Sequence, residues 1–181
     1  MITPYLTKDY ENIVVILLDG MGTAIVEKNL GTDGFFRKHM KGSYSSVFPP
    51  TTVAATTSII SGLHPCRHGW LGWDCYFPGL DKNVSVFTNT ESGTDIPAAD
   101  FPVASTYCGY ESIASRIRAN GGQAYEISPF IEPFPQDFGE ICGKIKELCR
   151  RPGKKYLYAY WTEPDHLMHE KGCYGEETVK T

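Results

Sequence analysis

The stretch Ile13-Val14-Val15-Ile16-Leu17-Leu18-Asp19-Gly20 decides the fold of this chain. It contains an unbroken apolar run from Ile13 to Leu18, in which most of the residues are β-branched. A run of this kind predicts a strand that is buried on both faces, as the central strands of parallel sheets are. The run stops at Asp19-Gly20, where we expect the chain to turn.

Strand and helix patterns alternate along the rest of the chain. Capping residues, helical spacing and terminal glycines predict helices, and short β-rich runs predict further strands. In chain order these are a helix over Thr52–Ser61 that ends at Gly62, a helix over Tyr110–Asn120, a strand over Gln123–Ile127, a helix over Phe138–Cys149 and a strand over Tyr156–Trp161. We expect Trp70–Ser105 to be a long excursion over the strand ends. The alternation predicts a single α/β domain over residues 1–181, with a mostly parallel sheet and helices on both faces.

Composition and charge exclude several classes of protein. The 181 residues carry a formal net charge of -4 and their 17 Lys and Arg are scattered, so we expect no nucleic acid polymer as partner. Residues 1–11 lack a cationic segment followed by an apolar run, and Ile13–Leu18 is too short for a bilayer, so we expect no leader and no membrane partner. The six cysteines form no C-x-x-C pair and are expected to be reduced. These features predict a cytoplasmic protein.

Residues that directly follow strands are the first candidates for a functional site, because ligands of open α/β sheets bind beyond the carboxyl ends of the strands. Asp19 is one of them, although an aspartate at this place also suits a plain turn. Thr51 and Thr52 stand at the start of a predicted helix, where N–H groups and the helix dipole favour a nucleophilic hydroxyl and an anionic phosphoryl group. Capping is nevertheless the commoner role of a threonine there, and the residue types alone do not choose between Thr51 and Thr52.

Asp165 and His169 follow the last predicted strand. They are four residues apart, so one helical turn puts both on the same face, where a carboxylate and an imidazole can share a divalent metal. An ion pair on the surface is a more frequent reason for this spacing. His64 and His68 have the same spacing, which also suggests a shared metal.

The three segments occur together and in one order, and in this they resemble the alkaline phosphatase superfamily, and within it the type I phosphodiesterase or nucleotide pyrophosphatase group. Asp19 matches the metal-binding aspartate at the end of the family's strand. Phe48–Gly69 resembles the family's Phe-Pro-x-x-Thr segment with the following Thr/Ser-Gly-Leu-x-Pro-x-x-His-Gly, which puts the nucleophile at Thr52. The family pattern also implies a structural role, and not a metal-binding one, for the loop with His64 and His68. Glu163–Gly172 resembles the pattern Glu-Pro-Asp-x-x-x-His-x-x-Gly. The resemblance implies an alkaline-phosphatase-like core.

The resemblance also implies an activity, that of a phosphoric ester hydrolase that uses two divalent metal ions, zinc or manganese. Asp19 and Thr52 would hold one ion, and Asp165 and His169 the other. Thr52 would attack the phosphorus of a small phosphorylated substrate, while backbone N–H groups near Val53 would bind the phosphoryl oxygens.

Two departures from the family pattern qualify this assignment. Ala55 stands where many nucleotide pyrophosphatases have an asparagine, which weakens the assignment to nucleotide diesters. No Asp-His-Gly motif, with which the family completes its metal sites, follows His169. We therefore expect a truncated N-terminal half that is weakly active or inactive alone and that associates with itself through an exposed sheet edge.

Two alternatives remain at the level of sequence. One is a non-catalytic domain that binds a phosphoryl group or a partner, and the other is a manganese-dependent, phosphomutase-like enzyme. The tyrosines Tyr156, Tyr158 and Tyr160 alternate along a predicted strand, and for them we expect a packing role.

Overall fold

The computed structural model describes residues 6–180, without the side chain of residue 179. The chain forms two compact units. Residues 1–44 and 117–181 make up the sheet unit, and residues 45–116 make up the insert unit. Residues 1–5, which belong to the stretch in which we expect no leader, lie outside the described residues, as does Thr181. The expectation of a single domain over 1–181 stays a prediction.

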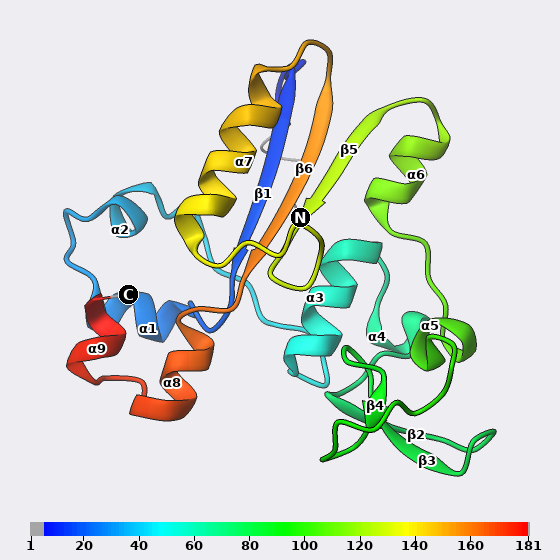
Figure 1. Cartoon of the computed structure of the whole chain (residues 1–181). Helices are drawn as coiled ribbons and strands as arrows, with labels where there is room; N and C mark the ends of the chain where they lie inside the picture. The colour runs from blue at the N-terminus through cyan, green and yellow to red at the C-terminus, as the bar shows by residue number, and fades with distance from the viewer. Residues whose placement is uncertain (1–5, 181) are drawn as a thin grey trace. The chain divides into compact units, whose positions relative to one another are not determined.

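The sheet unit is a parallel sheet flanked by helices, as the sequence predicts (Figure 1). Its elements in chain order are β1 (Asn12–Leu18), α1 (Thr23–Asn29), α2 (Phe35–His39), β5 (Gln123–Ile127), α7 (Phe138–Arg150), β6 (Lys155–Trp161), α8 (Asp165–Lys171) and α9 (Glu176–Lys180). The strand order is β1-β6-β5, and both ladders are parallel. The carboxyl ends of all three strands therefore lie at the same end of the sheet.

One core cluster holds α7 against the sheet. Ile141 and Leu148 of α7 pack on Ile127 of β5 and on Leu157 and Ala159 of β6. Asp137 caps α7 by accepting a hydrogen bond from the N–H group of Glu140 at 2.8 Å. The helical spacing of apolar residues thus corresponds to the buried face of a helix.

The position of β1 corrects one expectation. The apolar run predicts a central strand, but β1 lies at the edge of the described sheet and β6 is the central strand. Val14 and Ile16 are 36% and 45% exposed, because the cluster under α7 contains residues of β5 and β6 but none of β1. A hydrophobic pattern indicates that a strand is suited to burial. It does not indicate which other elements pack against that strand.

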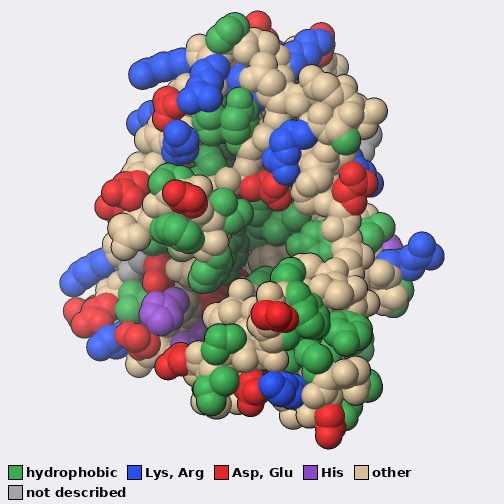
Figure 2. Space-filling view, turned by 45° about the vertical axis from the view of Figure 1, so that its right-hand side comes forward, with side chains coloured by type: hydrophobic (Ala, Val, Ile, Leu, Met, Phe, Trp, Pro, Cys, Tyr) green, Lys and Arg blue, Asp and Glu red, His purple; other side chains and the backbone are tan. Residues whose placement is uncertain are grey.

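The amino ends of the strands are basic. Lys and Arg side chains gather at the upper end of the visible face in Figure 2, where the turn between α7 and β6 lies in Figure 1. The Lys155 ammonium group is buried there and donates to the carbonyl oxygens of Arg151 and Gly153 and to the amide oxygen of Asn12. These acceptors satisfy the donors of a buried cation, so Lys155 ties the turn to the start of β1.

The insert unit contains α3 (Thr52–Ser61), α4 (Pro65–His68), β2 (Asp74–Phe77), β3 (Lys82–Ser85), β4 (Thr90–Glu91) and α5 (Val103–Tyr107). The helix α6 (Ile113–Ala119) spans the boundary between the two units. Its predicted start at Tyr110 is too early by three residues, whereas α3 and β5 have the predicted bounds.

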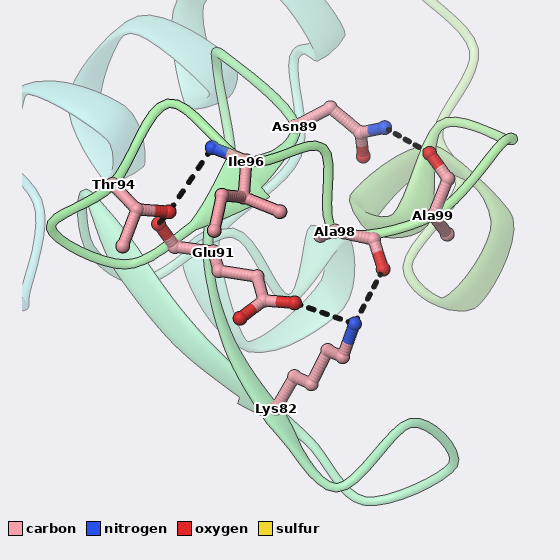
Figure 3. A network of polar contacts seen from close by, with 7 residues as sticks. All are labelled: Lys82, Asn89, Glu91, Thr94, Ile96, Ala98 and Ala99. Carbon is pink, nitrogen blue, oxygen red and sulfur yellow. Dashed lines mark hydrogen bonds and ion pairs between the residues drawn. The ribbon is translucent and has the colours of Figure 1, made fainter.

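The region Trp70–Ser105 is more regular than the sequence suggests. Strands β2, β3 and β4 form an antiparallel sheet of their own, which the sequence analysis missed. Polar contacts hold the segment that follows it (Figure 3): Lys82 pairs with Glu91 at 2.6 Å and donates to the carbonyl oxygen of Ala98 at 3.2 Å. Short strands in a stretch rich in Gly, Asn and Thr give only a weak periodic pattern in the sequence. Side-chain contacts such as these help to hold the segment in place.

Candidate functional site

Asp19 lies directly beyond the carboxyl end of β1. Leu18 is opposite Trp161 in the parallel ladder of β1 and β6, and the Asp19 N–H group continues that ladder by donating to the carbonyl oxygen of Trp161 at 3.0 Å. The first residue of α8 is equally close, because the N–H group of Asp165 donates to the carbonyl oxygen of Asp19 at 3.2 Å. Two of the predicted metal ligands, from distant parts of the sequence, are therefore brought together.

Gly20 makes this approach possible. Its φ angle is +73°, in the left-handed region that favours glycine. A Cβ atom at this position would lie 2.9 Å from both Cα and Cβ of Asp165. Only a residue without a side chain lets the first turn of α8 come this close to the end of β1.

Both oxygens of the Asp19 carboxylate have hydrogen-bond donors. Oδ1 accepts from the N–H group of Gly20 at 2.9 Å, and Oδ2 accepts from the hydroxyl group of Tyr160 at 2.7 Å. Tyr160 is 7% exposed. Burial raises the pKa of its phenol, and the hydrogen bond to Asp19 raises that pKa further, so the hydroxyl group keeps its proton and donates.

Asp165 and His169 lie one turn apart on α8, as the sequence predicts. Asp165 Oδ2 and His169 Nε2 are 3.3 Å apart, and the side chains are 32% and 79% exposed. The helix is capped from the preceding segment, because Glu163 Oε2 accepts from the N–H group of Leu167 at 2.9 Å. The two side chains thus stand together on an ordered helical turn and remain open to a ligand.

The donor types at these positions suit a divalent metal. Carboxylate oxygen and imidazole nitrogen bind zinc and manganese alike, and the Asp165–His169 pair already has the two donors side by side. Within residues 6–180, no three His, Cys, Asp or Glu side chains group closely enough to hold a metal ion. Asp165 and His169 together, and Asp19 by itself, fall short of the three protein ligands that a catalytic zinc ion usually has.

Thr52 is the first residue of α3 in the insert unit and is half-buried. The capping role belongs to its neighbour: Thr51 Oγ1 accepts from the N–H group of Ala54 at 3.2 Å and donates to the carbonyl oxygen of Leu71 at 2.8 Å. Among the described residues, no hydrogen bond is found for the hydroxyl group of Thr52. The helix ends at Gly62 with a φ angle of +72°, as the sequence predicts.

His68 has a structural role. It is 1% exposed, its Nε2 lies 3.0 Å from Ser58 Oγ, and its Nδ1 accepts from the N–H group of Trp70 at 3.1 Å. An acceptor at Nδ1 leaves the ring proton on Nε2. Both nitrogens are engaged within the insert unit, so His68 is not available to a metal, and burial lowers the pKa of its imidazole.

Sequence reasoning missed two residues of this site, Gly20 and Tyr160. The packing role expected for Tyr160 is incomplete, since the ring is buried but its hydroxyl group binds Asp19 across 141 positions of sequence. The available signal is that Tyr160, like Asp19, lies near the carboxyl end of a predicted strand. Only the pairing of β1 with β6 turns that proximity into a contact.

Comparisons with known proteins place this geometry in context. Among the helices that the structure describes, none has the length and apolar character needed to cross a membrane. No curated protein matches the chain. Murine ectonucleotide pyrophosphatase/phosphodiesterase 5, solved as an inactive threonine-to-alanine form in complex with AMP, has a similar fold, with a TM-score of 0.68 and 20% sequence identity. The match covers 94% of this chain and 48% of that chain.

This likeness shows the fold, an α/β architecture like that of the solved phosphodiesterase, of which the chain spans about half the length. The sequence itself gives the family. Residues 13–181 match the family described as type I phosphodiesterase / nucleotide pyrophosphatase, and the chain therefore belongs to this family of phosphoric ester hydrolases.

Proposed function

We propose that the chain carries the nucleophile and part of the metal sites of a metal-dependent phosphoric ester hydrolase. Thr52 is the nucleophile, and Asp19, Thr52, Asp165 and His169 are the ligands of two divalent metal ions, zinc or manganese. The hydrogen bond from the Asp165 N–H group to the carbonyl oxygen of Asp19, at 3.2 Å, carries the proposal. It brings together the backbones of two acidic residues that the resemblance assigns to two different metal ions.

The bound ions would supply positive charge that lowers the pKa of a coordinated hydroxyl group and neutralises phosphoryl oxygens. The chain's own residues orient these charges. Asp19 is fixed through both carboxylate oxygens, and Asp165 and His169 are held on one capped helical turn.

Thr52 suits the role of nucleophile better than Thr51 does. The hydroxyl group of Thr51 is occupied as acceptor and as donor, in the cap of α3 and in the contact to Leu71. Thr52 stands in the first turn of α3, whose N–H groups lack acceptors inside the helix and whose dipole favours a phosphoryl anion. The N–H groups of Thr52 and Val53 are the natural donors to that anion.

The substrate in this proposal is a small phosphorylated compound. The similar murine protein was solved with AMP, which supports nucleotides as candidate substrates. Ala55 provides no amide group to a phosphoryl oxygen, so any preference between monoesters and diesters must come from other contacts.

The chain by itself is expected to be a weak catalyst that also self-associates. Catalytic zinc usually has three protein ligands, and each proposed site has two here. The uncovered β1 edge, with its exposed Val14 and Ile16, is the surface through which we propose self-association. All six cysteines are unpaired, which supports a reducing compartment, and we propose the cytoplasm.

The first experiment is a calorimetric titration of the chain and of Asp165→Ala with zinc and with manganese, followed by assays with p-nitrophenyl phosphate and bis-p-nitrophenyl phosphate. We expect weak metal binding that Asp165→Ala reduces, because one carboxylate ligand is removed. We also expect slow, metal-dependent turnover that Thr52→Ala abolishes.

The matched control is Thr51→Asn, which keeps a good helix cap and removes only the neighbouring hydroxyl group. It should retain the turnover that Thr52→Ala loses. Loss of turnover in Thr51→Asn alone would make Thr51 the nucleophile. A chain that binds no metal and cleaves neither ester would favour the non-catalytic alternative.

A further inference from the structure

We propose that Tyr160 is a positioning residue that fixes the carboxylate of Asp19 in the orientation needed to bind a metal ion. The inference rests on the proposed function, because it takes Asp19 as a metal ligand. It adds a residue that neither the sequence pattern nor the family assignment singles out.

The geometry at Asp19 leaves little freedom to the carboxylate. Its Oδ2 accepts from the Tyr160 hydroxyl group at 2.7 Å, and its Oδ1 accepts from the N–H group of Gly20 at 2.9 Å. Two donors on opposite oxygens set the rotation of the carboxylate plane. Each carboxylate oxygen has two lone pairs, so a hydrogen bond to an oxygen is compatible with a metal ion bound to the same carboxylate.

Tyr160 is itself held rigidly. It lies on the central strand β6, opposite Leu17 of β1, and is 7% exposed. The ring of Phe130 stacks on its ring, with centroids 6.2 Å apart and an interplanar angle of 28°. A buried hydroxyl group without its acceptor would cost free energy, because it could not replace the lost hydrogen bond with one to water. The tyrosine and the carboxylate therefore keep each other in place.

Contacts of this kind matter for metal binding. Groups that hold the ligands of a metal typically change its affinity by about 10- to 100-fold when they are removed, because a ligand that can rotate must be ordered again on binding. A purely structural tie between β6 and the end of β1 would act differently. Its loss would lower the melting temperature and leave the affinity of the folded chain for metal unchanged.

The test is a zinc titration of the 181-residue chain in the background of Asp165→Ala, which isolates the Asp19 site from the other. The variant Tyr160→Phe removes only the hydroxyl group and should raise the zinc dissociation constant by about 10- to 100-fold. The matched control is Tyr158→Phe, since Tyr158 lies two residues earlier on β6 and is 4% exposed. It should leave the dissociation constant within about twofold, and melting curves without zinc report whether each variant is folded.

The outcomes separate this inference from the proposed function. If Asp19→Ala removes zinc binding and Tyr160→Phe retains it at full affinity, the inference about Tyr160 fails and the proposed function stands. Equal weakening by Tyr160→Phe and Tyr158→Phe also overturns the inference. Zinc binding that is unchanged in Asp19→Ala, or absent from the unmodified chain, overturns both.

A second measurement applies if Tyr160→Phe does not fold. A crystal structure of the unmodified chain with zinc should show Asp19 bound to the ion while Oδ2 still accepts from Tyr160. A zinc-bound structure in which the tyrosine hydroxyl group has left the carboxylate would contradict the inference.

Discussion

At the scale of single residues, the burial of His68 makes the stability of the folded chain depend on pH. Its ring nitrogens contact Ser58 Oγ and the N–H group of Trp70, and burial lowers its pKa. The unfolded chain therefore takes up a proton at this position at a higher pH than the folded chain does. The stabilising contribution is complete above the pKa of a free histidine, about 6.5, and decreases as the pH falls below that value.

We therefore predict that the free energy of unfolding falls between about pH 7 and pH 5, by at most about 1.4 kcal/mol per pH unit from this one group. Urea unfolding followed by tryptophan fluorescence measures it. His64→Gln, which alters an exposed histidine in the same segment, should keep the pH dependence, and His68→Gln should reduce it. Equal pH dependence in all three chains would show that other groups are responsible.

The residues of the candidate site differ in how far the sequence predicts them. Asp19 follows an apolar strand and Asp165 and His169 are four residues apart, so local patterns made them candidates, and the resemblance to a known family selected them as metal ligands. Gly20 and Tyr160 owe their roles to partners elsewhere, Asp165 and Asp19, and no local pattern shows such a pairing. Sequence therefore identified the groups that the resemblance takes as metal ligands, and the structure identified the groups that hold one of them.

At the scale of elements, predictability follows the same division. The ends of α3 are determined locally, by the cap of Thr51 and the left-handed Gly62, and its predicted bounds are confirmed. The edge position of β1 and the antiparallel sheet of the insert unit depend on which strands pair. The expectation of a central β1 is therefore wrong, and no local pattern predicts the antiparallel sheet.

At the same scale, the side chain of Asn89 connects two segments of the insert unit. Its φ angle is +57°, its Oδ1 accepts from the N–H group of Val103 at 2.8 Å, and its Nδ2 donates to the carbonyl oxygen of Phe101 at 2.9 Å. A further contact to Ala99 is visible in Figure 3. One side chain thus joins the segment between β3 and β4 to the start of α5.

We predict that Asn89→Ala lowers the free energy of unfolding by about 2 to 4 kcal/mol, from the lost hydrogen bonds and from the strain of an alanine at positive φ. Asn89→Gly loses the same hydrogen bonds without that strain, so its loss should be smaller by about 1 kcal/mol. Urea unfolding of the three chains gives the order. A glycine variant as unstable as the alanine variant would exclude the backbone contribution.

At the scale of the whole molecule, β1 is the strand most open to association, because it lies at the edge of the sheet that the structure describes. Val14 and Ile16 are exposed on it, and an apolar groove lined by Leu18, Phe138 and Trp161 lies beyond its end. Figure 2 shows hydrophobic side chains on the visible face among the charged ones. A free strand edge with apolar side chains is suited to pairing with another strand.

We predict that the chain forms a dimer whose population rises with concentration, and that Ile16→Lys shifts it to the monomer. A lysine on an edge strand opposes pairing, because its charge would have to be buried in the new sheet. Sedimentation velocity over a range of concentrations measures the equilibrium. Phe35→Lys is the matched control, since it changes a 71% exposed aromatic residue on α2 and leaves β1 intact. If both variants dissociate the dimer equally, association depends on exposed apolar area in general, and a chain that is monomeric at every concentration would show that β1 does not pair with a second copy.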